Sequence, residues 1–294
     1  MWSDDRVSTA SDSTPPTVDP AALRLVAVRV ATEAAQHLQG LPRPWESGGA
    51  AGSVATKSTP TDVVTASDTA LETLVRARLS ELRPGDAVVG EEHGGTPGVD
   101  PERVVWVVDP IDGTVNFLYG LPWYAISVAA TRGGASLAGA VVEPDSGRVW
   151  SAAVGLGATC DGRPLAVNGV TDVALSLLGT GFGYDGRRRA RQAAMVAALL
   201  PRVRDVRRTG SAALDLCAVA AGWTDAYLEH GCNWWDWAAA ALVAREAGAV
   251  VRTPGVAGTG TPDDGLGADA ILAAAPGIAA ELAALAREAG AADV

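Results

Sequence analysis

The sequence predicts a mixed α/β protein, because two kinds of pattern fill different parts of the chain. Short apolar runs separated by turn residues indicate strands in the first half. From about residue 168 onward, strand-like runs alternate with alanine-rich helical stretches, which is typical of layered α/β proteins. Of its 294 residues, 48% are hydrophobic and 19% are charged, so the chain can bury a large core.

The first half, residues 21–167, is expected to open with two helices and to continue as a sheet. Apolar residues at helical spacing predict helices at 20–38 and 67–82. Five consecutive apolar residues at 104–108 predict a buried strand, which should end at Pro110 because proline cannot donate to a sheet ladder. Further strands are expected at 87–89, 125–131, 138–143, 149–154 and 165–167.

The second half, residues 168–294, is expected to alternate between helices and strands. Gly248 suits the position after a helix end, where a left-handed backbone is easiest for glycine. A strand at 249–252 and a loop rich in Gly and Pro at 253–269 should follow it. The predicted helices lie at 195–200, 212–221, 238–247 and 277–290.

Charge and cysteine content limit the class of protein. A formal charge of −11 disfavours non-specific binding of nucleic acid. Three cysteines without a CxxC pair provide no disulfide framework, which favours a reducing compartment. Residues 1–20 lack the apolar stretch of a signal peptide, and we expect a disordered leader there. No uncharged apolar run reaches about 18 residues, so we expect a cytoplasmic protein without a membrane partner.

Five acidic residues stand at the ends of predicted elements. Two follow one strand three residues apart, one follows another strand, and two stand in the first turns of helices. Each alone is an ordinary cap or turn residue, but strand ends and helix starts of layered α/β proteins converge on one crevice. Carboxylate oxygens select a hard ion, so the set predicts a site for Mg²⁺ or Mn²⁺. The five residues are Asp68, Glu91, Asp109, Asp112 and Asp236.

Two enzyme mechanisms that proceed through a covalent intermediate find no support in the sequence. Enzymes of the haloacid dehalogenase type need DxDxT after a strand, but here the two acids are three residues apart and Ile111 stands where the second Asp is required. No GxSxG or CxxxxxR motif is present for a serine or cysteine nucleophile. Gly113 and Thr114 instead offer backbone N–H groups where a phosphate can dock.

Basic residues leave more than one interpretation open. Lys57 is the only lysine beside 22 arginines, and it belongs to no P-loop because positions 51 and 56 are not glycine. The arginines between 187 and 208 are expected on solvated helix faces, with contact to a phosphate or a partner as the alternative. His93 is expected to be a loop residue, or else a group that supports neighbouring metal ligands.

Several segments, taken in their order along the chain, resemble one known family. They are KSTPTDVVTASD at 57–68, GEE at 90–92, DPIDGTVNF at 109–117, GSAA at 210–213, DAYLEHG at 225–231 and WDWAA at 235–239. From about residue 22 to its end, the chain is similar to the inositol monophosphatase family of metal-dependent phosphomonoesterases, and above all to its bacterial inositol-1-monophosphatases. Ala240 departs from the glycine that many members carry there, and Trp237 is bulkier than their usual residue.

The resemblance implies a metal site made of named residues. The first ion corresponds to Glu91, Asp109 and the backbone carbonyl of Ile111, and the second to Asp109, Asp112 and Asp236. The family uses two or three Mg²⁺ ions, with Mn²⁺ as a substitute, and is often inhibited by Li⁺.

It also implies residues for catalysis and for substrate contact. Thr114 and Asp68 correspond to the pair that orients the attacking water, with Glu91 and Lys57 as further catalytic residues. The substrate contacts correspond to Asp112, Gly113, Thr114, Ala212 and Glu229.

The implied fold is the five-layered αβαβα sandwich of the inositol monophosphatase and fructose-1,6-bisphosphatase type, usually as a homodimer. The implied partner is a small-molecule phosphate monoester, with myo-inositol 1-phosphate favoured. Fructose 1,6-bisphosphate, histidinol phosphate and 3′-phosphoadenosine nucleotides are alternatives with the same chemistry. A regulatory binding protein that retains the fold is the alternative from a different class.

Overall fold

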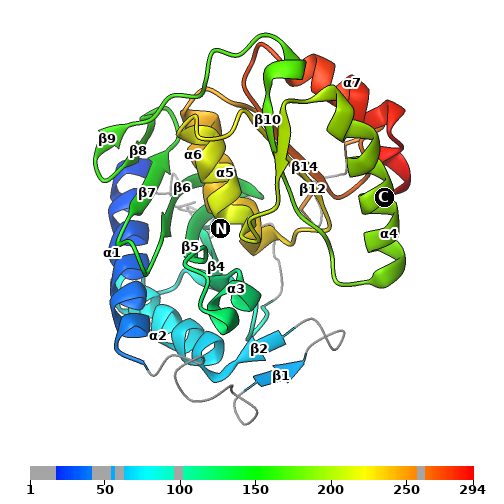
Figure 1. Cartoon of the computed structure of the whole chain (residues 1–294). Coiled ribbons are helices and arrows are strands. Elements are labelled where there is room, and N and C mark those ends of the chain that lie inside the picture. Colours follow the sequence, from blue (N-terminus) through cyan, green and yellow to red (C-terminus); the bar gives the residue numbers. More distant parts are fainter. Residues whose placement is uncertain (1–17, 42–53, 57–62, 96–101, 257–261) are drawn as a thin grey trace, which may run out of the picture.

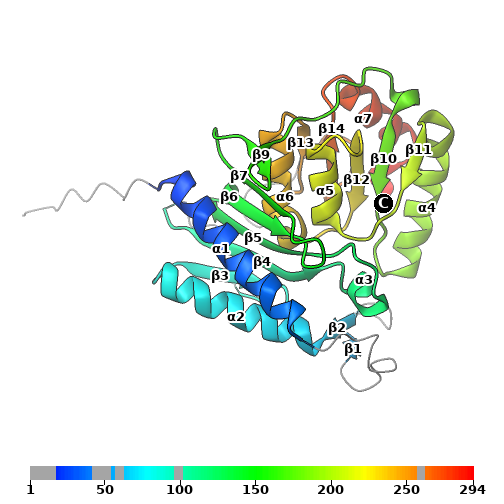
Figure 2. The same cartoon turned by 60° about the vertical axis from the view of Figure 1, so that its left-hand side comes forward.

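The chain folds into five layers, as the resemblance implies. The computed structural model describes residues 18–41, 54–56, 63–95, 102–256 and 262–294. A helix pair, a seven-stranded sheet, a second helix pair, a five-stranded sheet and a third helix pair follow one another through the molecule (Figure 1, Figure 2). Hydrophobic clusters fill the spaces between these layers.

The seven-stranded sheet has the order β3-β4-β5-β6-β7-β8-β9. β3 pairs with β4 in parallel, and the other neighbours pair antiparallel. Helices α1 (Pro20–Gln39) and α2 (Ala66–Leu82) cover one face, as Figure 2 shows. The strands are β3 (Ala87–Gly90), β4 (Val105–Asp112), β5 (Ala125–Arg132), β6 (Ala135–Val142), β7 (Val149–Ala153), β8 (Ala158–Cys160) and β9 (Arg163–Pro164).

The five-stranded sheet has the order β11-β10-β12-β14-β13. β10 pairs in parallel with β11 and β12, whereas β14 pairs antiparallel with β12 and β13. Helices α4 (Gly186–Leu199) and α7 (Ala279–Glu288) cover its outer face. The strands are β10 (Leu177–Thr180), β11 (Asp205–Arg207), β12 (Ala226–His230), β13 (Val250–Arg252) and β14 (Ala270–Ala274). A small antiparallel pair, β1 (Val54–Thr56) and β2 (Val63–Thr65), lies near the short helix α3 (Thr114–Tyr119).

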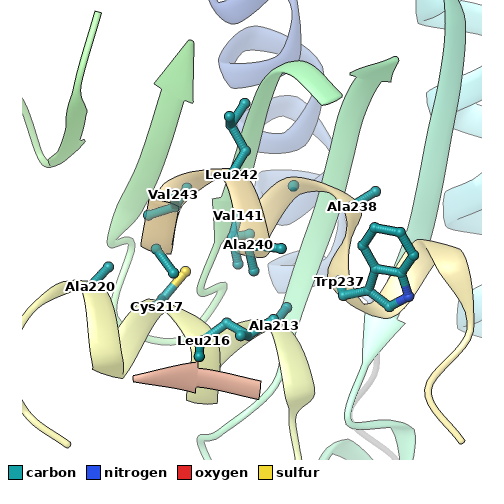
Figure 3. Packing of buried hydrophobic residues seen from close by; sticks show 14 of the residues in the cluster. Val141, Ala213, Leu216, Cys217, Ala220, Trp237, Ala238, Ala240, Leu242 and Val243 are labelled. Carbon is teal, nitrogen blue, oxygen red and sulfur yellow. The ribbon is translucent and has the colours of Figure 1, made fainter. Parts of the chain in front are cut away.

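Helices α5 (Ala212–Ala220) and α6 (Trp234–Glu246) form the middle layer. All of α5 is buried, and so are the four alanines at 238–241 of α6. These small side chains let α6 approach the sheet so closely that a Cβ added at Gly139 of β6 would lie 2.8 Å from the Cα of Ala239. Figure 3 shows this layer, in which Ala240 is buried near Leu216 of α5 and Val141 of β6.

Strand β4 does not end at Pro110 as expected but continues to Asp112. Asp109 pairs with Ser127 and Asp112 with Ala125, so three steps along β4 match two steps along β5. β4 therefore contains one extra residue, a β-bulge. The missing N–H of Pro110 is tolerated because a bulge leaves a residue out of the ladder. The amide of Ile111 donates to Asp109 Oδ1 instead (3.0 Å).

Two other predicted elements differ from the structure. Residues 165–167 do not form a strand, because the chain has left the sheet and the amide of Val167 donates to the carbonyl of Ala247. α4 begins nine residues earlier than the predicted 195–200, since the carboxylate of Asp185 caps its first turn by accepting from the amide of Arg188 (2.8 Å).

Some sequence-based expectations stay predictions. Of the leader at 1–20, only the last three residues are described, and Pro20 already belongs to α1. The division into halves at 21–167 and 168–294 stays a prediction. Among the described helices, none combines the length and the apolar character that a membrane span requires.

Replacing Gly139 by alanine should destabilise the middle layer. The added methyl group would overlap the backbone of α6, and overpacking of a tight core costs about 1–3 kcal/mol. Urea unfolding measures the difference. Gly169→Ala is the matched control, because a Cβ there meets nothing within 4 Å. Equal stability of the two variants would contradict the close approach of α6 and β6.

Candidate active site

Three predicted metal ligands converge where β4 ends and α6 begins. One oxygen from each of Asp109, Asp112 and Asp236 lies within 4.8 Å of the others. Residues three apart on a regular strand point to opposite faces. The bulge in β4 cancels this difference, so Asp109 and Asp112 can act together. Glu91, after the end of β3, contributes a fourth carboxylate that interacts with Asp109.

Each carboxylate is oriented by groups from its surroundings. Asp112 accepts hydrogen bonds from the Ser211 hydroxyl and from the amide of Ala213 (2.8 Å), both at the start of α5. Asp236, in the first turn of α6, accepts from the amide of Asn233 (2.7 Å). Negative charge is favourable at both places, because the amides of a first helical turn lack partners within the helix.

Thr114 and Asp68 form the contact that the resemblance implies. The Thr114 hydroxyl lies 3.1 Å from Asp68 Oδ1 and 3.0 Å from the carbonyl oxygen of Ile111, so it can donate to either. Asp68 is fully buried in the first turn of α2. Gly113 precedes α3 with φ of 95°, a conformation that favours glycine, and it turns the chain from β4 into the helix.

A cavity of about 550 Å³ contains most of the predicted site residues. Its far wall includes Glu229 of β12, whose carboxylate accepts from the Tyr227 hydroxyl. Gly181 faces Glu229 so closely that a Cβ there would lie 1.8 Å from its carboxylate oxygen. The predicted site residues in the lining are Glu91, Asp109, Ile111, Asp112, Gly113, Thr114, Ala212, Glu229 and Asp236. Lys57 lies outside the described residues.

Burial and mutual repulsion dominate the electrostatics of the site. Desolvation by burial raises the pKa of Asp112 to about 7, although the bonds from Ser211 and Ala213 oppose this. Burial, together with the charges of neighbouring carboxylates, raises the pKa of Asp109 and of Asp236. Buried carboxylates that repel one another are destabilising, and they cluster mainly where a bound cation neutralises their charge. The all-oxygen donor set fits a hard divalent ion. The site can hold a metal ion.

Two arginines line the cavity, the half-buried Arg188 and the exposed Arg208. Solvated faces were expected for the arginines of this region, with contact to a phosphate or a partner as the alternative. Arg188 also pairs with Asp269 (2.5 Å). Their positions depend on how α4 and the segment after β11 fold back over the cavity, and no local motif signals this. The other arginines of the cluster at 187–208 are exposed, as expected.

Other sequence-based interpretations concern side chains outside the cavity lining. Trp237 lines a separate cavity of about 390 Å³ instead, so its bulk does not shape the candidate active site. His93 lies on an exposed turn, with Nδ1 3.3 Å from Glu72 Oε1. Neither side chain is among the residues that line the cavity with the carboxylate cluster.

Comparison with known proteins agrees with this geometry. The sequence profile of the Inositol monophosphatase family matches residues 19–291. An inositol-1-monophosphatase of Mycobacterium leprae is 53% identical over 289 residues, 93% of this chain and 97% of that protein. The inositol-1-monophosphatase SuhB of Mycobacterium tuberculosis is 50% identical over 282 residues, 92% of this chain and 94% of that protein. The solved structure of Mycobacterium tuberculosis SuhB superimposes with a TM-score of 0.76 at 44% identity, covering 93% of this chain and 99% of that one.

Fold and site therefore define a phosphatase built on a five-layered sandwich. The chain belongs to the inositol monophosphatase family.

The metal-free protein should lose stability as pH rises from about 5 to about 8. The folded-state pKa is raised to about 7 for Asp112 and to about 8 for buried Asp215 of α5. Between an ordinary carboxyl pKa and these values, the folded protein holds more protons than the unfolded chain, so the free energy of unfolding falls with rising pH. Urea unfolding of chelator-treated protein across this range measures the effect.

Mg²⁺ added at pH 8 should restore this stability, because a bound cation favours the ionised carboxylates. Asp112→Asn serves as the comparison, since it removes one titrating group and should flatten the pH profile. A profile that is flat for the parent protein would contradict the assignment.

Proposed function

We propose that the chain hydrolyses myo-inositol 1-phosphate, with Mg²⁺ as its metal. One observation carries the proposal: the carboxylates of Asp109, Asp112 and Asp236 share one cavity with Thr114, whose hydroxyl contacts buried Asp68 behind the cavity lining. The two mycobacterial relatives described above are named inositol-1-monophosphatases. Each is similar to this chain over nearly the whole length of both proteins.

The residues suit Mg²⁺ better than zinc, because the candidate ligands are all oxygens. Asp109 would contribute to both ion positions, with Glu91 and the Ile111 carbonyl on one side and Asp112 and Asp236 on the other. Bound Mg²⁺ would supply an acidified water and neutralise charge on the phosphoryl oxygens.

Thr114 would orient the attacking water. When its hydroxyl donates to buried Asp68, a lone pair of Oγ1 stays available to accept a hydrogen bond from water. Gly113 precedes α3 and Thr114 is its first residue, and the amides of a first helical turn, which lack partners within the helix, can bind phosphate oxygens. Asp68 therefore fixes the direction of the Thr114 hydroxyl, and Thr114 fixes the water.

Residues in the far wall of the cavity can bind the hydroxyl groups of a substrate. The Glu229 carboxylate already accepts from Tyr227 and has further lone pairs for vicinal hydroxyls of a polyol. Ala212 leaves room for a ring because its side chain is small. Fructose 1,6-bisphosphate, histidinol phosphate and 3′-phosphoadenosine nucleotides are the competing substrates. Because Arg188 and Arg208 line the cavity, a substrate with a second anionic group is an informative comparison.

Asp109→Asn should abolish Mg²⁺-dependent phosphate release from inositol 1-phosphate, because Asp109 is the residue shared by both ion positions. Phosphate release from the four candidate substrates measures both activity and preference. Asp293→Asn, an exposed change near the C-terminus, is the control that should keep full activity. If the parent protein releases no phosphate from any of these monoesters with Mg²⁺, the proposed function is wrong.

Thr114→Val should lower kcat by about 10²-fold or more, since loss of a group that handles the water proton has this size. KM should change little, because the hydroxyl faces the water rather than the substrate ring. Thr114→Ser keeps the hydroxyl and should retain most activity. Equal kcat values for the Val and Ser variants would exclude the hydroxyl from the reaction.

A second candidate function follows from the names of more distant relatives. A protein of Pasteurella multocida named Nus factor SuhB is 40% identical over 191 residues, which cover 65% of this chain and 71% of that protein. A regulatory role would require the fold but not the carboxylates. Asp109→Asn separates the two functions, because a regulatory partner would still bind its target.

A further inference from the structure

A buried carboxylate outside the cavity holds the turn that carries Glu91. Glu72 lies on α2, and its side chain has 0% of its surface exposed. Its Oε2 accepts from the amide of Glu92 (2.6 Å), and its Oε1 lies 3.2 Å from the amide of His93. The two residues that follow Glu91 are therefore bound to one carboxylate.

Arg76 completes this arrangement from the next turn of α2. Its Nε donates to Glu72 Oε1 (2.7 Å), which compensates the buried charge. Its two other nitrogens donate to the carbonyls of Val88 (3.1 Å) and Gly94 (2.6 Å), one on each side of the turn. The Glu72–Arg76 pair thus holds the backbone of 88–94 at both ends and in the middle.

Gly90 shows how closely the turn lies against this pair. A Cβ added at Gly90 would lie 2.2 Å from Glu72 Oε1. The position directly before Glu91 therefore accepts only glycine while Glu72 keeps its place. Glu72 itself is absent from the cavity lining, and its contacts are to backbone amides, Arg76 and His93.

We propose that Glu72 is a positioning residue for metal binding, which acts by fixing the turn that presents Glu91 to Asp109. This rests on the proposed role of Glu91 as a metal ligand. Residues that orient a ligand from behind typically change metal affinity by about 10–100-fold when they are replaced. Glutamine cannot substitute well, because its NH₂ group would face donors where the carboxylate now offers only acceptors.

Glu72→Gln should raise the Mg²⁺ concentration for half-maximal phosphate release by about 10–100-fold. At saturating Mg²⁺ most of kcat should return, because Glu72 lies outside the cavity lining. The rise in Tm on adding Mg²⁺ should shift to higher Mg²⁺ concentration by the same factor, which gives a readout without turnover. Glu81→Gln, an exposed change on the same helix that removes a partner of Arg78, is the matched control and should leave Mg²⁺ affinity unchanged.

A double-mutant cycle tests whether Glu72 acts through Glu91. In the Glu91→Gln background, adding Glu72→Gln should change Mg²⁺ affinity much less than it does in the parent protein. Additive losses, or unchanged Mg²⁺ affinity in Glu72→Gln, would overturn the inference. If Glu72→Gln does not fold, Gly90→Ala takes its place, because it displaces the turn while Glu72 stays intact, and the same outcomes apply.

Failure of the inference differs from failure of the proposed function. An inactive parent protein with Mg²⁺ would reject the function itself. An active parent with an unaltered Mg²⁺ response in Glu72→Gln, or in Gly90→Ala where Glu72→Gln does not fold, would reject only the positioning role.

Discussion

The candidate site depends on the extra residue that β4 holds between Asp109 and Asp112. Without it, a spacing of three along a strand would direct the two carboxylates to opposite faces of the sheet. With it, both lie at one end of the sheet, within reach of Asp236. Pro110 suits this place because it has no N–H to leave unpaired, and the Asp109 carboxylate accepts from Ile111 in compensation. A local irregularity of the backbone thus determines the chemistry of the whole cavity.

By bringing like charges together, the bulge alone would destabilise the fold. Groups from the other layers offset this repulsion. Asp112 is bonded to the start of α5, Asp236 belongs to the start of α6, and Thr114 at the start of α3 contacts Asp68 on α2. Several helices therefore direct their amino-terminal ends at one place, where negative charge is stabilised. The pKa of Asp112 and of Asp236 is still raised, so the helix ends reduce the repulsion without removing it. A bound metal ion would complete the balance.

Much of this was predictable from the sequence, for identifiable reasons. The order of the GEE, DPIDGT and WDWAA segments predicted the fold through resemblance, whereas apolar periodicity alone predicted only an α/β class. Residue type and position at element ends predicted the carboxylate cluster. The continuation of β4 past Pro110 was missed, because a bulge is set by pairing with β5 and not by local propensity. The sequence left the place of Arg188 and Arg208 open for a similar reason, since only tertiary folding brings α4 and the segment after β11 to the cavity.

Core packing and site geometry are also linked through α6. The alanines at 238–241 and Gly139 let this helix lie against β6 at short distance, and the first turn of the same helix carries Asp236. Because a helix moves as a rigid unit, a larger side chain in its middle would displace Asp236 from Asp109 and Asp112 as well as strain the core. The same logic applies to Gly90 and Gly181, where the absence of a side chain lets a carboxylate take its place. Small residues at these contacts thus affect metal binding indirectly. They allow the close packing that sets the positions of the carboxylates, although none of them can bind a metal through a side chain.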